Sequence, residues 1–183
     1  GRSRDDIGSA LKFSGIWQLP DFGHGFLSGT VLSGWEVNAI WTWRDGFPFS
    51  VQSGLDNSFS GVGSDRADLI KSGDPQLSSG RNDGQKVAEY FDTSFLAANA
   101  VGTFGNSGKD ILRGPKFFNI DLGLLKDIPI AEALSLQFRA EFFNVFNNVN
   151  FYQPDNTVTD PTFGQILSAR DPRILQFALK LRF

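Results

Sequence analysis

Strict alternation of apolar and polar side chains over residues 173–183 constrains this chain more than any other feature. Every second residue from Leu175 to Phe183 is large and apolar, and the residues between them are small, polar or charged. Successive side chains of a β-strand point to opposite faces, so the segment predicts a strand with one apolar and one polar face. Its length also matches that of a tilted strand that crosses a bilayer as part of a barrel.

Four further segments show the same alternation. They cover residues 11–19, 34–51, 117–125 and 134–146, with Ile16 and Ile40 out of phase. Asp45 and Gly46 interrupt the second segment in a way that suits a bulge or a sheet edge. No run of apolar residues in the sequence is long enough for a transmembrane helix. Because the chain also has 19 Phe and 20 Gly, the sequence favours an all-β fold.

The connections between these segments alternate in length. Short connections follow the first and third segments, whereas long ones at 54–112 and 147–172 follow the second and fourth. Outer-membrane barrels combine short periplasmic turns with long extracellular loops. We therefore expect an antiparallel up-and-down transmembrane β-barrel segment with long extracellular loops. The alternative is a soluble β-sandwich, in which the apolar face would pack against a second sheet.

In the barrel interpretation, the polar face lines a wet lumen and the apolar face meets lipid. Both signs of charge occur on the polar face, so neighbouring strands can pair them. The expected lumen-facing residues are Glu36, Asn38, Asn119, Asp121, Gln137, Arg139, Glu141 and Lys180. Glu36, Asp121 and Glu141 leave a glycosidase-type carboxylate pair as an alternative. Charge pairing in the lumen accounts for them better, and we expect no enzymatic activity.

Composition argues against a metal centre or a cofactor. The chain has no Cys and a single histidine, His24, which lies between glycines, so we expect no thiolate or zinc site and no catalytic histidine. A net charge of −3 gives no support to nucleic-acid binding. Asp56, Asn57, Asp65 and Asp68 leave a calcium site as an alternative, but their spacing does not fit an EF-hand, and solvated turn residues are the favoured interpretation.

The long loops are where a ligand would be contacted. The candidate ligand-binding residues are Arg66, Asp68, Tyr90, Phe91, Arg113, Tyr152 and Arg170. Arg113 and Arg170 flank strand starts, so positioning of the loops explains them equally well. The four tryptophans share the phase of the apolar face and suit an aromatic girdle. Within the first long loop, residues 87–100 are expected to contain a helical turn.

Several motifs carry a resemblance to a known family. Gly34-Trp-Glu-Val-Asn-Ala-Ile is followed by Asp45-Gly-Phe-Pro-Phe-Ser-Val. The long loop then contains Tyr90-Phe-Asp-Thr-Ser, Gly102-Thr-Phe-Gly-Asn-Ser-Gly and Leu112-Arg-Gly-Pro. Phe118-Asn-Ile-Asp-Leu, Phe138-Arg-Ala-Glu-Phe-Phe-Asn-Val-Phe-Asn and Asp171-Pro-Arg complete the series. In this order, the motifs resemble the C-terminal end of a TonB-dependent transporter barrel, of the Oar-like kind with a carboxypeptidase-regulatory-like domain.

The resemblance implies a transporter in the outer membrane of a Gram-negative bacterium. Such a protein has a 22-stranded barrel and an N-terminal plug, and it imports a scarce, bulky ligand with energy from the TonB system. Residues 1–183 would then be a fragment, the C-terminal part of the receptor barrel with about its last five strands. The alternative function is that of a soluble β-sandwich carbohydrate- or ligand-binding module.

The resemblance also implies several partners. They are the rest of the barrel, the plug domain and outer-membrane lipid. A TonB-type energy transducer would act through the missing N-terminal part. Leu179, Leu181 and Phe183 would form the signal that the outer-membrane assembly machinery reads.

Overall fold

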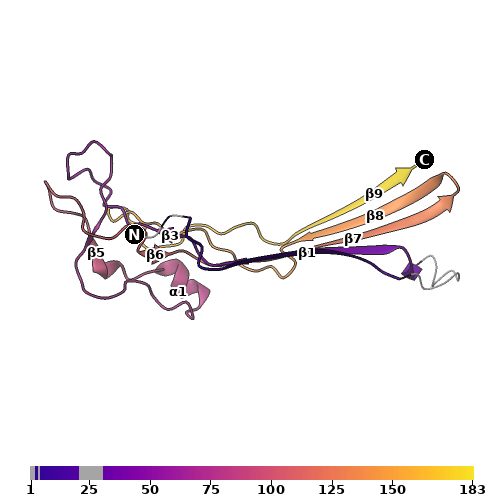
Figure 1. Ribbon diagram of the computed structural model, residues 1–183, viewed down its shortest axis with the longest axis horizontal. Coiled ribbons are helices and arrows are strands. Elements are labelled where there is room, and N and C mark those ends of the chain that lie inside the picture. Colours follow the sequence, from indigo (N-terminus) through magenta and orange to yellow (C-terminus); the bar gives the residue numbers. More distant parts are fainter. Residues whose placement is uncertain (1–2, 4, 21–30) are drawn as a thin grey trace. The chain divides into compact units, whose positions relative to one another are not determined.

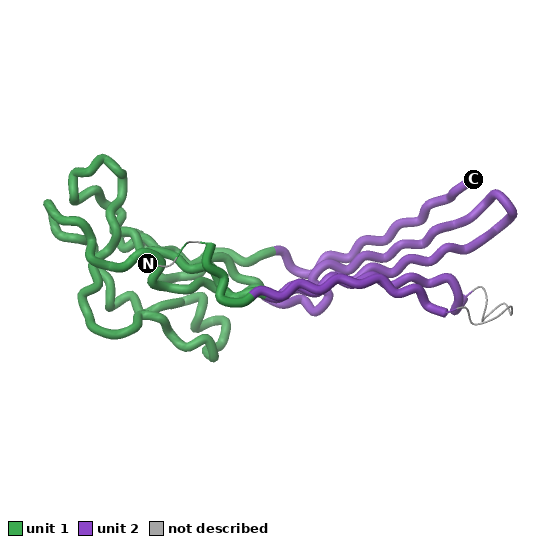
Figure 2. Tube along the Cα trace, in the orientation of Figure 1, with its two compact units in different colours: residues 1–9, 44–117, 150–170 green, residues 10–43, 118–149, 171–183 purple. Residues whose placement is uncertain are grey.

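The computed structural model describes residues 3, 5–20 and 31–183, so the prediction for His24 lies outside the described residues. The chain forms two compact units (Figure 2). Unit 1 comprises residues 1–9, 44–117 and 150–170, and unit 2 comprises residues 10–43, 118–149 and 171–183.

Unit 2 is built on a five-stranded sheet (Figure 1). Its strands are β1 (Ala10–Gln18), β2 (Trp35–Arg44), β7 (Phe117–Ala131), β8 (Leu134–Phe143) and β9 (Ile174–Arg182), in the order β1-β2-β7-β8-β9. Each of the five alternating segments therefore contributes one strand to this sheet. Strand β8 pairs antiparallel with both β7 and β9. In the described residues this sheet is open, with β1 and β9 at its edges.

The register of β8 and β9 places apolar side chains directly opposite one another. Leu136 faces Leu181, Phe138 faces Leu179, Ala140 faces Phe177, and Phe142 faces Leu175. Large side chains of this face are exposed, among them Phe13 at 63 %, Phe177 at 66 % and Leu179 at 69 %. A soluble sandwich would bury such a face against a second sheet, which none of the described residues provides. A face of this kind is suited to a hydrocarbon environment.

The polar face carries polar interactions within and between strands. We expected charge pairs between neighbouring strands, but one ion pair lies within β8 and another connects β9 to β7. Gln137 donates to Asp127 over 3.0 Å, and Arg182 lies 3.5 Å from the same carboxylate. Arg139 forms an ion pair of 3.2 Å with Glu141 on the same strand. These interactions give the charges of the face partners within the sheet.

Strand β7 is longer than the sequence predicted. Residues 126–133 were expected to form a short connection, but β7 continues to Ala131, with a register shift between Pro129 and Ala131. The register places Lys126 opposite Phe138, on the apolar face. Its ammonium group donates to the Ser33 carbonyl and lies 5.1 Å from the Trp35 ring centroid. A lysine can keep its place on this face because its charge is partnered there.

Strands β2 and β8 end earlier than predicted. Strand β2 ends at Arg44, and β3 (Pro48–Phe49) is a separate strand that pairs with β6 (Leu112–Arg113). Strand β8 ends where Asn144 adopts a positive φ of 51°. This residue's backbone N–H donates to the Asp121 carboxylate over 2.9 Å, so the turn is fixed by side-chain hydrogen bonds.

Unit 1 has secondary structure and a core of its own. It contains β3, β6, and the pair β4 (Asp68–Leu69) and β5 (Leu96–Ala97), together with α1 (Asp83–Ala88) and a 3₁₀ helix at Thr93–Phe95. Its buried hydrophobic cluster consists of Phe49, Val51, Ala67, Phe91, Leu96 and Leu112. The expected helical turn within 87–100 corresponds to the 3₁₀ helix. Helix α1 begins earlier because Asn82 and Gln85 form a capping box.

Among the described residues, no helix is both long and apolar enough to span a membrane.

Candidate functional site

Hydrogen bonds join the two long loops within unit 1. The Tyr90 N–H donates to the Gly164 carbonyl over 2.7 Å, and the Ile166 N–H donates to the Val87 carbonyl over 3.0 Å.

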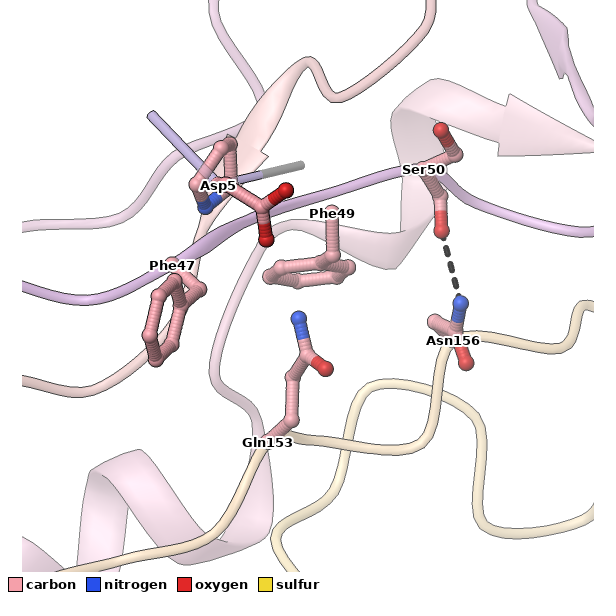
Figure 3. Close-up of a pocket in the computed structure, with 7 residues that line it drawn as sticks. Asp5, Phe47, Phe49, Ser50, Gln153 and Asn156 are labelled. Atoms are coloured by element: carbon pink, nitrogen blue, oxygen red, sulfur yellow. Dashed lines mark hydrogen bonds between the residues drawn. The ribbon is translucent and has the colours of Figure 1, made fainter. Parts of the chain in front are cut away.

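The second long loop is also joined to residues 50–52, which lead into the first. The backbone N–H of Gln52 donates to the Asn156 carbonyl over 2.8 Å, and the N–H of Val158 donates to the Gln52 carbonyl over 2.9 Å. The Asn156 side chain donates to the Ser50 carbonyl over 2.6 Å (Figure 3). Residues far apart in the sequence therefore form one surface.

A recess of about 400 Å³ lies where residues 47–50 meet the second long loop (Figure 3). Its walls include the rings of Phe47 and Phe49, the amides of Gln153 and Asn156, and the carboxylate of Asp5. In Figure 3 the Gln153 amide points toward the Phe49 ring. The recess combines aromatic surface with a few polar groups, as ligand sites commonly do.

Two arginines and three aromatic rings form a stack beside this recess. The Arg44 guanidinium carbon lies 4.4 Å from the ring centroid of Phe47 and 5.3 Å from that of Phe117. The Arg170 guanidinium carbon lies 5.2 Å from the Phe117 centroid and 4.9 Å from the Tyr152 centroid. We call these five residues the arginine–aromatic stack. Each of the four distances is within the range of a cation–π interaction.

The stack borders a second, smaller recess. This recess has a volume of about 160 Å³ and is lined by both arginines, Tyr152 and Gln153. Phe47 and Gln153 line both recesses, so the two are adjacent. The structure thus brings together two of the predicted ligand-binding residues, Tyr152 and Arg170. Sequence analysis did not select Arg44, Phe47 and Phe117, because nothing in the alternation distinguishes them from ordinary strand-end residues.

Arg66 and Arg113 line a different recess of unit 1, with a volume of about 730 Å³. Arg113 is engaged in holding the N-terminal segment. Its guanidinium forms an ion pair of 3.2 Å with Asp6 and donates to the carbonyls of Asp6 and Gly46. This agrees with a positioning role for Arg113.

The remaining predicted loop residues serve the architecture of unit 1. Asp68 accepts a hydrogen bond of 2.8 Å from the Asn106 N–H. Burial raises the pKa of Tyr90 to about 12. The Phe91 side chain is fully buried and packs against Phe49 and Phe163. This corrects the expectation for Phe91, because a ring without exposed surface offers no contact to a ligand.

The acidic residues of the first long loop organise their own turn. The Asp56 carboxylate accepts hydrogen bonds from the N–H groups of Ser60 and Gly61, over 3.0 Å and 2.9 Å. Asp65 accepts from the Ser58 hydroxyl over 2.6 Å and from the Asn99 amide over 3.0 Å. The hydrogen bond from Ser58, first of all, lowers the pKa of Asp65. In the described part of the chain, no group of three or more His, Cys, Asp or Glu residues is arranged to hold a metal ion.

The predicted lumen-facing residues share the polar face of the sheet. The register places Gln137 opposite Lys180, and Glu141 opposite Gln176. Further interactions are Gln18 to Glu36 at 3.4 Å, Asn119 to Asp121 at 2.8 Å, and close packing of Asn38 against Gly123. Leu179, Leu181 and Phe183 are exposed.

Comparison with known proteins identifies the family. No curated protein and no solved structure matches the chain significantly. A family model described as an outer membrane beta barrel domain matches residues 1–176, nearly the whole chain. The five-stranded sheet with its exposed apolar face agrees with this match. The chain therefore belongs to the outer membrane beta barrel domain family.

Proposed function

We propose that this chain forms part of the barrel wall and the outer loops of a TonB-dependent transporter that imports a scarce, bulky ligand. The observation that carries the proposal is the folding of the long connections into a unit with its own buried core and recesses. Loops that only join strands need no such core. A preformed recess on loops held by a rigid scaffold suits capture of a ligand.

Family membership gives the setting of this proposal. An outer membrane beta barrel domain is located in the outer membrane and associates with its lipid. The apolar face of β1, β8 and β9 is the surface suited to that lipid.

The motifs that resemble Oar-like transporters support the finer assignment, because they fall on the elements that build both units. Asp45-Gly-Phe-Pro-Phe-Ser-Val contains β3, and Leu112-Arg-Gly-Pro begins with β6, its pairing partner. Tyr90-Phe-Asp-Thr-Ser supplies Phe91 to the core. These three motifs thus help to shape unit 1, which we also call the loop unit.

Import against a concentration gradient requires energy, which a passive wall does not supply. We propose that a plug domain and a segment in contact with a TonB-type transducer, both outside these residues, couple the barrel of 22 strands to that energy. Leu179, Leu181 and Phe183 are proposed contacts for the assembly machinery. A non-enzymatic role is also proposed, since Glu36, Asp121 and Glu141 each already have a polar partner.

Solute depletion from the medium tests the transport function. Cells that produce the complete protein and cells that lack its gene are grown in the same medium, with and without a protonophore, and solutes are followed by mass spectrometry. We expect a bulky solute to be depleted only by producing cells, and only without the protonophore. Protein-dependent uptake that is restricted to small solutes and insensitive to the protonophore would indicate a passive pore and refute the proposal.

A further inference from the structure

Among the described residues, the arginines of the arginine–aromatic stack lack acidic partners, whereas three other arginines of the chain have them. Arg113, Arg139 and Arg182 each lie within 3.5 Å of a carboxylate oxygen. Within residues 3, 5–20 and 31–183, Arg44 and Arg170 form no ion pair, and their guanidinium groups donate no hydrogen bond. A guanidinium has five N–H donors, so both groups retain their full capacity to bind an acceptor.

The acidic residues next to these arginines in the sequence do not pair with them. Asp45 follows Arg44 directly, but its carboxylate pairs with Lys116 over 3.5 Å. Asp171 follows Arg170 directly, and within the described residues it forms no ion pair. The charges of Arg44 and Arg170 are close enough to act on each other. Two like charges at short range are unfavourable, and the ring faces offset only part of that cost. An anion between them would remove the repulsion.

Stacking leaves the arginines able to bind such an anion. A guanidinium that lies over a ring keeps its N–H groups along its own planar edge, the edge that pairs with carboxylate or phosphate oxygens. The shared ring of Phe117 lies 5.3 Å from one guanidinium carbon and 5.2 Å from the other. The Phe117 ring therefore holds both guanidinium groups beside the smaller recess.

The dimensions of the recesses indicate how a ligand would fit. A water molecule occupies about 30 Å³, so the recess of about 160 Å³ has room for a group of several heavy atoms. The adjoining recess of about 400 Å³ has the Phe49 ring and the amides of Gln153 and Asn156 for the body of a larger molecule. Figure 3 shows these side chains around the larger recess.

We propose that Arg44 and Arg170 together bind an oxyanion, a carboxylate or a phosphate group, carried by the molecule that the outer loops capture. The remainder of that molecule occupies the recess beside Phe49. This inference rests on the proposed function for the statement that the anion belongs to an imported ligand. Binding of the oxyanion itself requires no transport.

Chemical footprinting of the complete protein in zwitterionic detergent tests the site directly. Phenylglyoxal modifies exposed guanidinium groups, and peptide mass spectrometry measures the rate at each arginine. Pyrophosphate and citrate serve as soluble oxyanions, and lipid A in mixed micelles serves as a membrane phosphate. We expect an oxyanion to slow modification of Arg44 and Arg170 at least fivefold, with little effect on Arg173. Because the protein carries no substitution, the result does not depend on the folding of a variant.

Affinity measurements on variants provide the second test. Arg44→Gln and Arg170→Gln should each weaken binding of pyrophosphate or citrate, whichever protects, roughly 10- to 100-fold, which corresponds to the loss of a charge-assisted hydrogen bond. Lysine at either position keeps the charge but not the planar edge, so its effect should be intermediate. Lys109→Gln is the matched control. Lys109 is an exposed cation of unit 1 outside the stack, and its replacement should change affinity by less than about twofold.

The outcomes separate the sources of the anion and the two proposals. Protection by soluble anions alone assigns the site to a ligand from the medium, and protection by lipid A alone assigns it to a lipid headgroup. Both results support an oxyanion site, and lipid A can replace the soluble anion in the affinity series. The oxyanion site is overturned if no probe protects Arg44 and Arg170, or if Lys109→Gln loses as much affinity as Arg44→Gln and Arg170→Gln. Energy-dependent uptake without oxyanion binding would refute the oxyanion site but support the transport function. Oxyanion binding with passive uptake would refute the transport function but support the oxyanion site.

Discussion

Replacing Phe91 by alanine should release the loop unit from its folded state while the strands of unit 2 remain paired. The Phe91 ring has no exposed surface and contacts a ring of β3 and a ring of the second long loop, with its centroid 6.0 Å from that of Phe49 and 5.3 Å from that of Phe163. Truncation of a buried Phe costs about 3–5 kcal/mol, and the two aromatic contacts place this site in the upper part of that range. A loss of about 4–5 kcal/mol raises the open population of unit 1 about a thousand- to several-thousand-fold.

Native-state proteolysis of the complete protein in detergent measures this change. When reclosing is faster than cleavage, the cleavage rate follows the open population. Cleavage within residues 44–117 should therefore accelerate by about the same factor, until opening itself becomes limiting. Phe104→Ala is the matched control, because Phe104 belongs to the same unit and is 72 % exposed. An acceleration below about tenfold, or an equal one in the control, would refute the assignment of Phe91 to a cooperative core.

Three further predictions concern the membrane face, a close backbone approach and pH. Leu179→Arg should impair refolding into lipid vesicles by about 2–4 kcal/mol, whereas Gln176→Arg on the opposite face should have little effect. Gly46→Ala should loosen unit 1 to proteolysis, because a Cβ there would clash with the Gly114 carbonyl. The folded-state pKa of Asp65 is lowered by its hydrogen bonds, so its contribution is complete above the unfolded pKa of about 3.9 and is lost as pH falls through the folded value. Pepsin cleavage of unit 1 should rise accordingly below about pH 4, but less steeply in Asp65→Asn.

Each of the three has a result that would contradict it. Equal refolding of the two arginine variants would mean that the faces are not divided between lipid and water. Unchanged proteolysis of Gly46→Ala would mean that the backbone at residues 46 and 114 can move apart without loss of stability. If Asp65→Asn and the unsubstituted protein are equally sensitive to pepsin at every pH, protonation of Asp65 does not contribute to the loss of stability in acid.

The strands of unit 2 were predictable because their pattern is local. A period of two in hydrophobicity requires only that one face meet an apolar environment, and that condition holds from Leu175 to Leu181. The alternation did not predict the strand at Lys126 and Pro129, a charged residue and a residue without a backbone N–H. Residues 126–133 were expected to form a connection instead. The strand continues there because Trp35 and the Ser33 carbonyl partner the lysine, and a register shift accommodates the proline.

The loop unit was not predictable in the same way. Its core takes single hydrophobic residues from many short segments, so no period appears along the sequence. Its turns are held by side-chain to backbone hydrogen bonds, such as those to Asp56, which composition indicates only as a polar loop. Tyr152 and Arg170 were selected by residue type alone. Their neighbours Arg44 and Phe117 come from strand ends and could be identified only from the structure.

The separate core of the loop unit has an evolutionary consequence. Because the cluster around Phe91 is drawn wholly from segments of unit 1, its packing sets no condition on the alternation of the strands. Substitutions that reshape the recesses can therefore accumulate without disturbing insertion of the wall. With unit 1 outside the cell, as proposed, a lineage exposed to new solutes could change the surface of unit 1 while it inherits the strands of unit 2 unchanged.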